Sequence, residues 1–241
     1  MQMLMRQLSR QRSSFTNPRN SAAAMAHYFY LTACFCPLYS ESGMSADSHN
    51  LSPEQGQLLV KLARQTLSQQ LAKQIPQNEI DSLNTALTDP CFNLSCGTFV
   101  TLTIDGQLRG CIGNLTSNES LTSGVRRNAI NAAFHDPRFS PLGASELDRV
   151  SIEVSILSEP RPLDYQEASD LLKKLRPSID GVILHKGPAS ATFLPQVWEQ
   201  LPQPRDFLTH LCLKAGLASD AWQHSELEVS TYQVQYFEEQ R

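Results

Sequence analysis

Apolar residues recur at helical spacing in the first well-patterned stretch of the chain. They lie three or four positions apart and are Leu58, Leu59, Leu62, Ala63, Leu67 and Leu71. This period predicts an amphipathic helix. Ser52 can cap its start, Pro53 suits the first helical position, and Gln55 can complete a capping box. Pro76 ends the pattern, and the polar, irregular residues 76–96 are expected to form a loop.

A hairpin follows this loop. Residues 98–104 alternate with the period of a strand, and Asp105-Gly106 is a strong signal for a type I′ turn. The returning strand carries Arg109 and Cys111, and we expect Cys111 near its far end, opposite the start of the first strand. The two side chains share a face of the strand only if no bulge separates them.

Further periodic segments continue to the end of the chain. The predicted helices are 119–134, 165–175, 195–201 and 205–217, and the predicted strands are 149–157, 180–187 and 227–239. Helices and strands are mixed without a regular βαβ period or an internal repeat. The pattern therefore predicts an α+β fold whose sheets are mainly antiparallel and flanked by helices.

The charge changes sign near Met44. Residues 1–44 contain four arginines and one acidic residue, whereas the whole chain has a net charge of -4, so residues 45–241 carry -7. We interpret residues 1–44 as a disordered extension or the result of a start codon assigned too early. A signal peptide or a transit peptide is the alternative, because the segment is rich in arginine and serine and contains a short apolar run.

Composition narrows the class of protein. A hydrophobic fraction of 41% and a mean hydropathy of -0.29 are typical of a soluble protein, and no apolar run is long enough to span a membrane. Basic residues occur only in pairs, so no basic face for nucleic acid is expected. The six cysteines form no CxxC pair and no zinc-ligand spacing. A reducing, cytoplasmic compartment with free thiols and no metal site is the simplest interpretation.

Six short blocks of this sequence resemble the AMMECR1 domain family, in the order typical of that family. They are "GTFVTL" at 97–102, "LRGCIG" at 108–113, "DPRF" at 136–139, "IEVSIL" at 152–157, "FLPQVW" at 193–198 and "LCLKAGL" at 211–217. The resemblance implies one two-lobed α+β domain over residues 50–238. It also implies similarity to protein A of the AmmeMemoRadiSam system, and hence association with a Memo-like protein and a radical SAM enzyme.

The LRGCIG motif contains the main candidate for chemistry. Cys111 is a candidate nucleophile, since a cysteine reacts as its thiolate, whose formation a nearby cation favours. Arg109 is a candidate holder of an anion, and Gly110 and Gly113 let the backbone approach a ligand or form an anion nest before the following helix. The competing interpretation is that Cys111 is a small, buried core residue between glycines that mark close packing.

Three charged residues outside the motif are candidate binding residues. Asp136 and Arg138 can line a pocket in which Arg138 holds a carboxylate or phosphate, although a turn before Pro137 explains Asp136 as well. Glu153 lies on the strand face opposite Val150, Ile152 and Val154. If the second lobe covers that face, the carboxylate needs a partner, and Arg109 or Arg138 can serve.

Two hypotheses about function follow from these residues. The first is an enzyme-like site between the lobes that acts on a small molecule or a protein group, with Cys111 as nucleophile and Arg109 holding an anion. The second is a non-catalytic binding or adaptor module that uses the LRGCIG surface. An accessible, reactive Cys111 favours the first, and a buried Cys111 beneath an exposed apolar patch favours the second. The sequence indicates no substrate, cofactor or oligomeric state.

Overall fold

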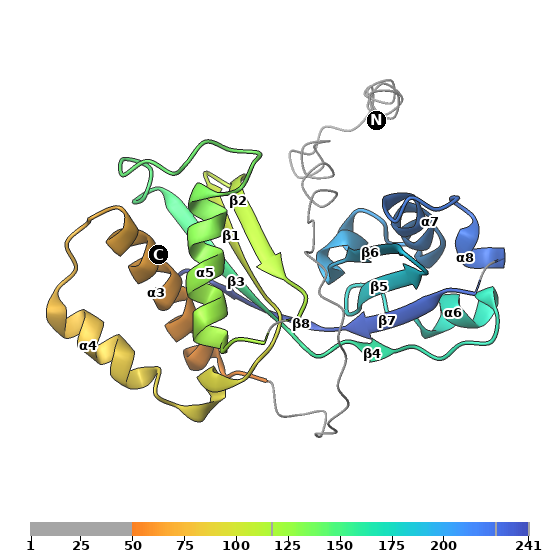
Figure 1. Ribbon diagram of the computed structural model, residues 1–241, viewed down its shortest axis with the longest axis horizontal. Coiled ribbons are helices and arrows are strands. Elements are labelled where there is room, and N and C mark those ends of the chain that lie inside the picture. The colour runs from red at the N-terminus through yellow and green to blue at the C-terminus, as the bar shows by residue number, and fades with distance from the viewer. Residues whose placement is uncertain (1–49, 117, 225, 241) are drawn as a thin grey trace.

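The computed structural model describes residues 50–116, 118–224 and 226–240, and these residues form two lobes that lie side by side (Figure 1). The proposed extension or targeting segment over residues 1–44 lies outside the described residues. Every strand pair within the two four-stranded sheets is antiparallel. The expected α+β fold with two lobes and antiparallel sheets is therefore confirmed.

The first lobe packs two helices against one face of a sheet. Its elements are α3 (Pro53–Gln70), α4 (Gln77–Ala86), η2 (Pro90–Asn93), β1 (Thr98–Ile104), β2 (Gln107–Asn114), α5 (Leu121–Phe134), β3 (Val150–Leu157) and β8 (Val234–Glu238). The strand order is β2-β1-β3-β8. Alternate residues of the central strands, such as Val100 and Leu102, are buried with apolar residues of α3 and α5. This leaves the opposite face of the sheet for other contacts.

The second lobe is built around a smaller sheet. Its elements are β4 (Arg161–Pro162), α6 (Ala168–Lys174), β5 (Gly181–Lys186), β6 (Ala189–Phe193), η3 (Pro195–Glu199), α7 (Pro204–Lys214), α8 (Ala221–His224) and β7 (Glu228–Tyr232), with the strand order β4-β7-β5-β6. Trp198 stacks on Phe207, with ring centroids 3.7 Å apart, at the centre of this lobe's core. Each lobe therefore has its own core.

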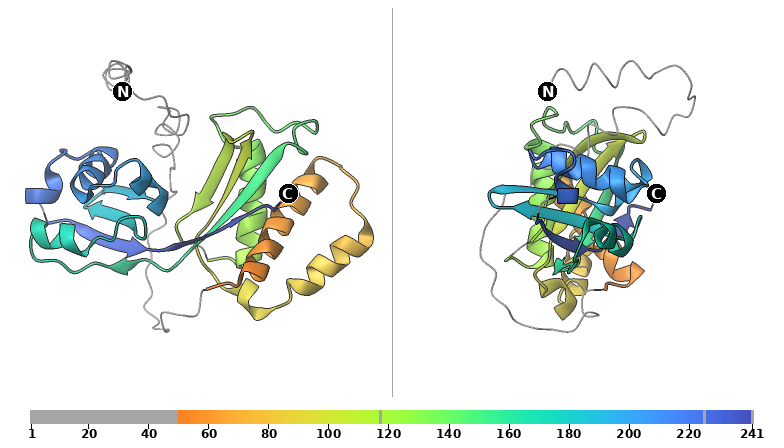
Figure 2. Two further views of the ribbon diagram at one scale, coloured as in Figure 1. Left: turned by 180° about the vertical axis from the view of Figure 1, so that it is seen from behind. Right: turned by 90° about the vertical axis from the view of Figure 1, so that its right-hand side faces the viewer.

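Two connections join the lobes, as the strands running from one lobe to the other show in the left view of Figure 2. One leads from β3 to β4 and the other from β7 to β8, and they are held together where Ser158 N donates to Gln233 O at 2.9 Å. A third apolar cluster lies beside them and combines residues of both lobes: Phe99, Cys111, Leu115, Leu157, Ile183, Leu194 and Tyr232. The free face of the first sheet therefore meets the second lobe.

Several local expectations are confirmed by the backbone. Ser52 caps α3 in a capping box with Gln55. Asp105 and Gly106 both have positive φ, 51° and 73°, as a type I′ turn requires. A bulge does interrupt β2: Leu102 pairs with Gly110 and the next residue of β1 pairs with Leu108, so Arg109 is the extra residue.

Other expectations are wrong. Residues 76–96 are not a loop, because α4 and η2 lie within them; α4 buries only Leu83, so its sequence has no apolar stripe to reveal it. The helix predicted over 195–201 is a 3₁₀ helix over Pro195–Glu199 rather than an α-helix. Cys111 pairs with Thr101 in the middle of β1, not with its start.

Within the described ranges, no helix combines the length and the apolar character needed to cross a bilayer. The same part of the chain contains no group of three or more His, Cys, Asp or Glu side chains placed to hold a metal ion. The four cysteines described, Cys91, Cys96, Cys111 and Cys212, are free thiols.

Candidate functional site

Four side chains form a polar row across the first sheet, on the face turned to the second lobe. Cys111 on β2 pairs with Thr101 on β1, Thr101 pairs with Glu153 on β3, and Glu153 pairs with Glu238 on β8. Residues directly opposite each other on neighbouring strands have Cβ atoms about 4.5–5.5 Å apart. The polar row therefore brings a thiol, a hydroxyl and a carboxyl group together beside the apolar cluster that joins the lobes.

The Cys111 thiol is buried and protonated at neutral pH. Its exposed fraction is 4%, and Thr101 Oγ1 donates to its Sγ at 3.2 Å. Burial raises the pKa of Cys111 to about 11. The hydrogen bond from Thr101 and the charge of Arg138 lower this pKa, while the charges of Glu153 and Asp136 raise it. In this conformation Cys111 has the properties of a weak hydrogen-bonding group rather than those of a thiolate.

Glu153 is the only carboxyl group of the polar row that is partly buried. Burial raises its pKa above the ordinary value; hydrogen bonds from Ser155 and Gln196 oppose this, and the charge of Glu238 adds to it. Both hydrogen bonds go to Oε1 and are long: 3.3 Å from Ser155 Oγ and 3.5 Å from Gln196 Nε2. The expectation that Arg109 or Arg138 serves as its partner is wrong, because other carboxylates bind both arginines.

Asp136 and Arg138 hold the backbone of Cys111 at the outer edge of β2. Asp136 Oδ2 accepts from Cys111 N at 2.9 Å, and Arg138 Nη2 donates to Cys111 O at 3.1 Å. The two side chains also form an ion pair, with 2.6 Å between Nη2 and Oδ2. Together they occupy the positions that a neighbouring strand's N–H and C=O would take, so the DPRF block completes an edge strand.

Replacing Asp136 tests this arrangement. Burial raises the pKa of Asp136, but the hydrogen bonds from Arg138 and from the Cys111 amide outweigh it and hold the pKa below its ordinary value. A lowered pKa stabilises the fold above the unfolded pKa, and this contribution is lost as the pH falls through the folded pKa. Asp136→Asn is therefore expected to cost about 2 kcal/mol at neutral pH.

The measurement is urea unfolding from pH 7 down to pH 3, and the difference between wild type and Asp136→Asn should shrink toward the acid end. Asp105→Asn is the matched control, because Asp105 forms an exposed ion pair with Arg149 and its loss should cost less than about 1 kcal/mol. An Asp136→Asn variant as stable as wild type at pH 7 would show that the pair contributes nothing.

Arg109 belongs to a different set of contacts. It is the bulged residue of β2, and its Nε and Nη2 donate to the Glu146 carboxylate at 2.8 and 3.1 Å. Its guanidinium lies 6.0 Å from the centre of the Phe139 ring, and that of Arg138 lies 5.4 Å from the same ring. Arg138, not Arg109, is the cation whose charge acts on the Cys111 thiol. One nitrogen of Arg109, the buried Nη1, has no hydrogen-bond partner in the described part of the chain.

The motif glycines are needed for close packing. A Cβ on Gly110 would lie 2.0 Å from Ala132 O, in the backbone of α5. A Cβ on Gly113 would lie 2.2 Å from the Phe99 ring and 2.3 Å from Thr98 O. Since real Cβ atoms do not approach other heavy atoms so closely, any side chain at Gly110 or Gly113 displaces a neighbour. The close approach here is between protein segments.

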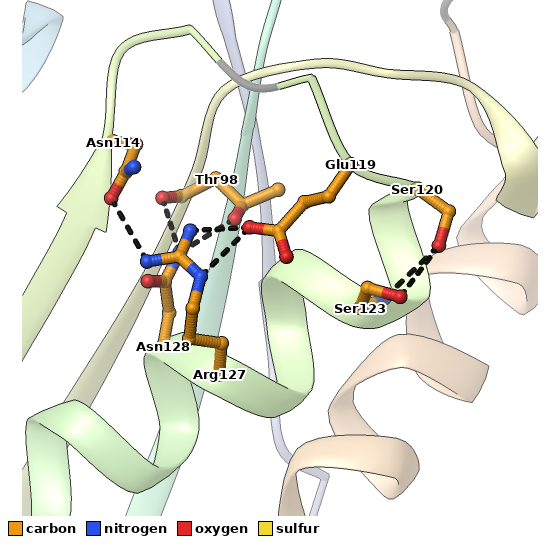
Figure 3. Close-up of polar contacts among 7 residues, drawn as sticks. All are labelled: Thr98, Asn114, Glu119, Ser120, Ser123, Arg127 and Asn128. Atoms are coloured by element: carbon orange, nitrogen blue, oxygen red, sulfur yellow. Dashed lines mark hydrogen bonds and ion pairs between the residues drawn. The ribbon is translucent and has the colours of Figure 1, made fainter. Parts of the chain in front are cut away.

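The end of the motif is tied to the start of α5 (Figure 3). Arg127 donates from Nε to Glu119 Oε1 at 2.8 Å and from Nη1 to Asn114 Oδ1 at 3.4 Å. Ser120 caps the helix by accepting from Ser123 N at 3.3 Å. Because the chain's own serine and carboxylate already lie at this helix end, the geometry does not favour an anion nest there.

Asn128 connects the same helix to the sheet. Its Nδ2 donates to Thr98 O at 3.0 Å and to Thr98 Oγ1 at 2.8 Å, as Figure 3 shows, and its side chain is fully buried. Gly124, one turn earlier, leaves room for Thr98, whose Oγ1 would lie 3.1 Å from a Cβ at that position. Asn128 thus holds α5 in register with the start of β1, on the sheet face opposite the polar row.

Sequence reasoning missed Thr101, Gln196 and Asn128. Thr101 occupies the centre of the polar row, and its position in the strand alternation was the only available signal. Gln196 comes from the second lobe, so no local pattern connects it with Glu153. Asn128 is a polar residue on the inner side of a predicted helix, and such a residue is buried only with partners.

The fold and the site together define a class of protein: two α+β lobes joined by a pair of strands, with a buried thiol and a carboxyl group between them. The model of the AMMECR1 family matches residues 60–237. The chain belongs to the AMMECR1 family.

Relatives and a solved structure agree with this assignment. A protein from Thermofilum pendens is 38% identical over 205 residues, covering 78% of this chain and 92% of that protein. A protein from Methanothermobacter thermautotrophicus is 36% identical over 197 residues, covering 78% of this chain and 96% of that protein. The crystal structure of the uncharacterized protein PH0010 from Pyrococcus horikoshii matches with a TM-score of 0.64 and 32% identity, over 77% of this chain and 91% of that one.

Proposed function

We propose that this protein is an enzyme component that binds a small molecule between its lobes and uses the Cys111 thiol on it. The observation that carries the proposal is the polar row itself: a thiol and a raised-pKa carboxyl group two strands apart, on the sheet face that meets the second lobe. Perturbed titratable groups gathered at one place favour a functional site over a purely structural one.

The protonation states limit the chemistry. A thiol with a pKa near 11 carries its proton at neutral pH, so we propose addition of the S–H group across a polarised double bond of the ligand. A bond forms between sulfur and carbon, the π electrons move to the more electronegative atom, and that atom receives the thiol proton. Because the thiol is 4% exposed, a ligand reaches it only if the lobes separate at their two connections.

The other candidate residues have supporting roles in this proposal. Gly110 and Gly113 let β2 pack against α5 and Phe99, and Asp136 and Arg138 position the backbone of Cys111. Glu153 binds the ligand. Arg109 is the proposed holder of an anion, since its buried Nη1 has no hydrogen-bond partner among the described residues; the Glu146 carboxylate beside it competes for that role.

Native mass spectrometry with metabolites tests the proposal. Full-length wild type and variants are incubated with small molecules extracted from cells, and adducts are located by peptide mapping. Wild type is expected to gain the whole mass of one metabolite at Cys111, and Cys111→Ser is expected to gain none. Cys212→Ser is the matched control, because Cys212 is a buried thiol in the core of the second lobe and should leave the adduct unchanged. Equal behaviour of wild type and Cys111→Ser would overturn the proposal.

We also propose that the protein acts in a system of the AmmeMemoRadiSam type, together with a Memo-like protein and a radical SAM enzyme. Family membership is the support for this part of the proposal. Size-exclusion chromatography of the purified proteins, alone and mixed, is the test. A complex supports the association, and separate elution of each mixture would contradict it.

A non-catalytic binding module is the second candidate. The burial of Cys111 and the use of its N–H and C=O by Asp136 and Arg138 favour it, because both suit a scaffold residue. An exposed apolar patch over the motif is the other expected sign. In the described part of the chain, however, the large exposed apolar side chains are Ile179 and Leu213, both in the second lobe. The adduct experiment separates the two candidates.

A further inference from the structure

We propose that the ligand of this site carries a protonated amine, and that Glu153 binds it. This inference rests on the proposed ligand site between the lobes and names the chemical class of its ligand. It follows from what surrounds the Glu153 carboxylate: two long hydrogen bonds to one oxygen and, within the described residues, no ion pair.

The two arginines expected as partners of Glu153 form ion pairs with other carboxylates. Arg109 pairs with Glu146, and Arg138 pairs with Asp136. Glu153 therefore lies in a partly buried position with a second carboxylate, Glu238, directly across the strand pair and with no positive charge paired to it in the part of the chain that the structure describes. A carboxylate in such a position is costly unless a cation is added.

The hydrogen bonds of the Glu153 carboxylate also favour an amine as the ligand group. Ser155 Oγ and Gln196 Nε2 both donate to Oε1, and in the described residues Oε2 accepts nothing. An ammonium group has three donors and no acceptor, so it can supply the absent positive charge and donate to Oε2 in place of solvent. A phosphate or a carboxylate placed at Glu153 would add a further negative charge beside Glu153 and Glu238, so this position disfavours an anionic group.

The second lobe contributes to the same position. Gln196 belongs to η3 of that lobe, and among the described residues it is the side chain of that lobe that donates a hydrogen bond to Glu153. At 3.5 Å this bond is weak, so an arriving amine can displace it at little cost. The titratable groups that bear on Glu153 are Glu238 on β8 and, along the polar row, Cys111 on β2.

The experiment uses simple probes of one size and three charges: n-butylamine, butan-1-ol and butyrate. The full chain is labelled with ¹³C at the glutamate carboxyl carbons, and the Glu153 signal, assigned with Glu153→Gln, is followed by NMR during each titration. We expect saturable shifts with n-butylamine alone and a fall in the pKa of Glu153 when it binds, because a cation favours the charged carboxylate. The Gln196 side-chain amide should shift as well.

Three variants make the result specific. Glu153→Gln, read at the Gln196 amide, should abolish the response, while Glu238→Gln, in the same row on the edge strand, should retain it. Glu153→Gln should unfold at the same temperature as wild type or higher, because a carboxyl group with a raised pKa opposes folding once the pH exceeds its ordinary value. A response equal for all three probes, a response that survives in Glu153→Gln, or no response to n-butylamine would each overturn the inference.

Cys111→Ser separates this inference from the proposed function. Amine binding should be retained in Cys111→Ser, because no hydrogen bond joins the thiol to the Glu153 carboxylate among the described residues and serine keeps the thiol's neutral charge. Amine binding without any adduct at Cys111 would leave the inference standing and remove the thiol chemistry. An adduct at Cys111 without amine binding would support the thiol chemistry and overturn the inference that Glu153 binds an amine.

Discussion

Gly110→Ala is expected to lose about 3 kcal/mol of unfolding free energy, at the upper end of the range for overpacked cores. The added Cβ would lie 2.0 Å from Ala132 O, and this oxygen belongs to the backbone of α5. A side chain could rotate away, but a helix can only shift as a unit. Because α5 also carries the Asn128 contacts to Thr98, such a shift disturbs the packing behind the polar row.

Chemical denaturation at neutral pH measures this loss, and Gly143→Ala is the matched control. A Cβ on Gly143 meets only the Glu146 and Ser145 side chains, at 3.5 and 3.8 Å, which are ordinary contacts. Replacing a glycine without strain changes stability by less than about 1 kcal/mol, usually in the favourable direction. If Gly110→Ala and Gly143→Ala unfold alike, α5 does not approach β2 as closely as described.

Native Cys111 is expected to react with iodoacetamide at least about 100-fold more slowly than a small free thiol at pH 7.5. An ordinary cysteine thiol has a pKa of about 8.5, whereas burial raises the pKa of Cys111 to about 11. The thiolate fraction therefore falls by more than two orders of magnitude, and the greater nucleophilicity of a more basic thiolate offsets only part of this loss. Burial of the sulfur reduces the rate further.

Cys91 separates ionisation from access within the same protein. Its pKa is also raised to about 11, first by burial and then by Asp89, but its side chain is only partly buried. Both thiols should react slowly, and Cys111 should be the slower of the two in peptide mapping after brief labelling. Faster labelling of Cys111 than of Cys91 would show that the lobes expose the motif thiol even without a ligand.

The destabilisation by Gly110→Ala and the slow alkylation of Cys111 together test whether the LRGCIG motif serves packing or binds a ligand. The glycine substitution acts on the contact between β2 and α5, and the alkylation acts on the face turned to the second lobe. If the motif serves packing alone, Gly110→Ala should destabilise the protein, and the slow labelling of Cys111 should not change with any added metabolite. A metabolite that blocks the slow labelling of Cys111 and leaves that of Cys91 unchanged would instead support a ligand site between the lobes.

The sequence alone determined the local elements wherever the chain carries a strong pattern. The capping box at Ser52, the I′ turn at Asp105-Gly106 and the alternation of β1 and β3 are short-range features, because each depends on contacts within a few residues. The blocks around LRGCIG also indicated the family, and with it the two-lobed fold. The sequence did not predict α4, because a helix that buries only Leu83 has no periodic pattern of apolar residues.

Tertiary structure alone decided which candidate residues meet. Arg109 and Cys111 are two positions apart, yet the bulge directs Arg109 to Glu146, while Arg138 reaches the backbone of Cys111 from 27 residues away. Glu153 and Gln196 come from different lobes and meet only because β3–β4 and β7–β8 fold the lobes together. Such contacts depend on strand register and on the packing of whole elements, and these are set by the sum of many weak interactions far apart in the sequence.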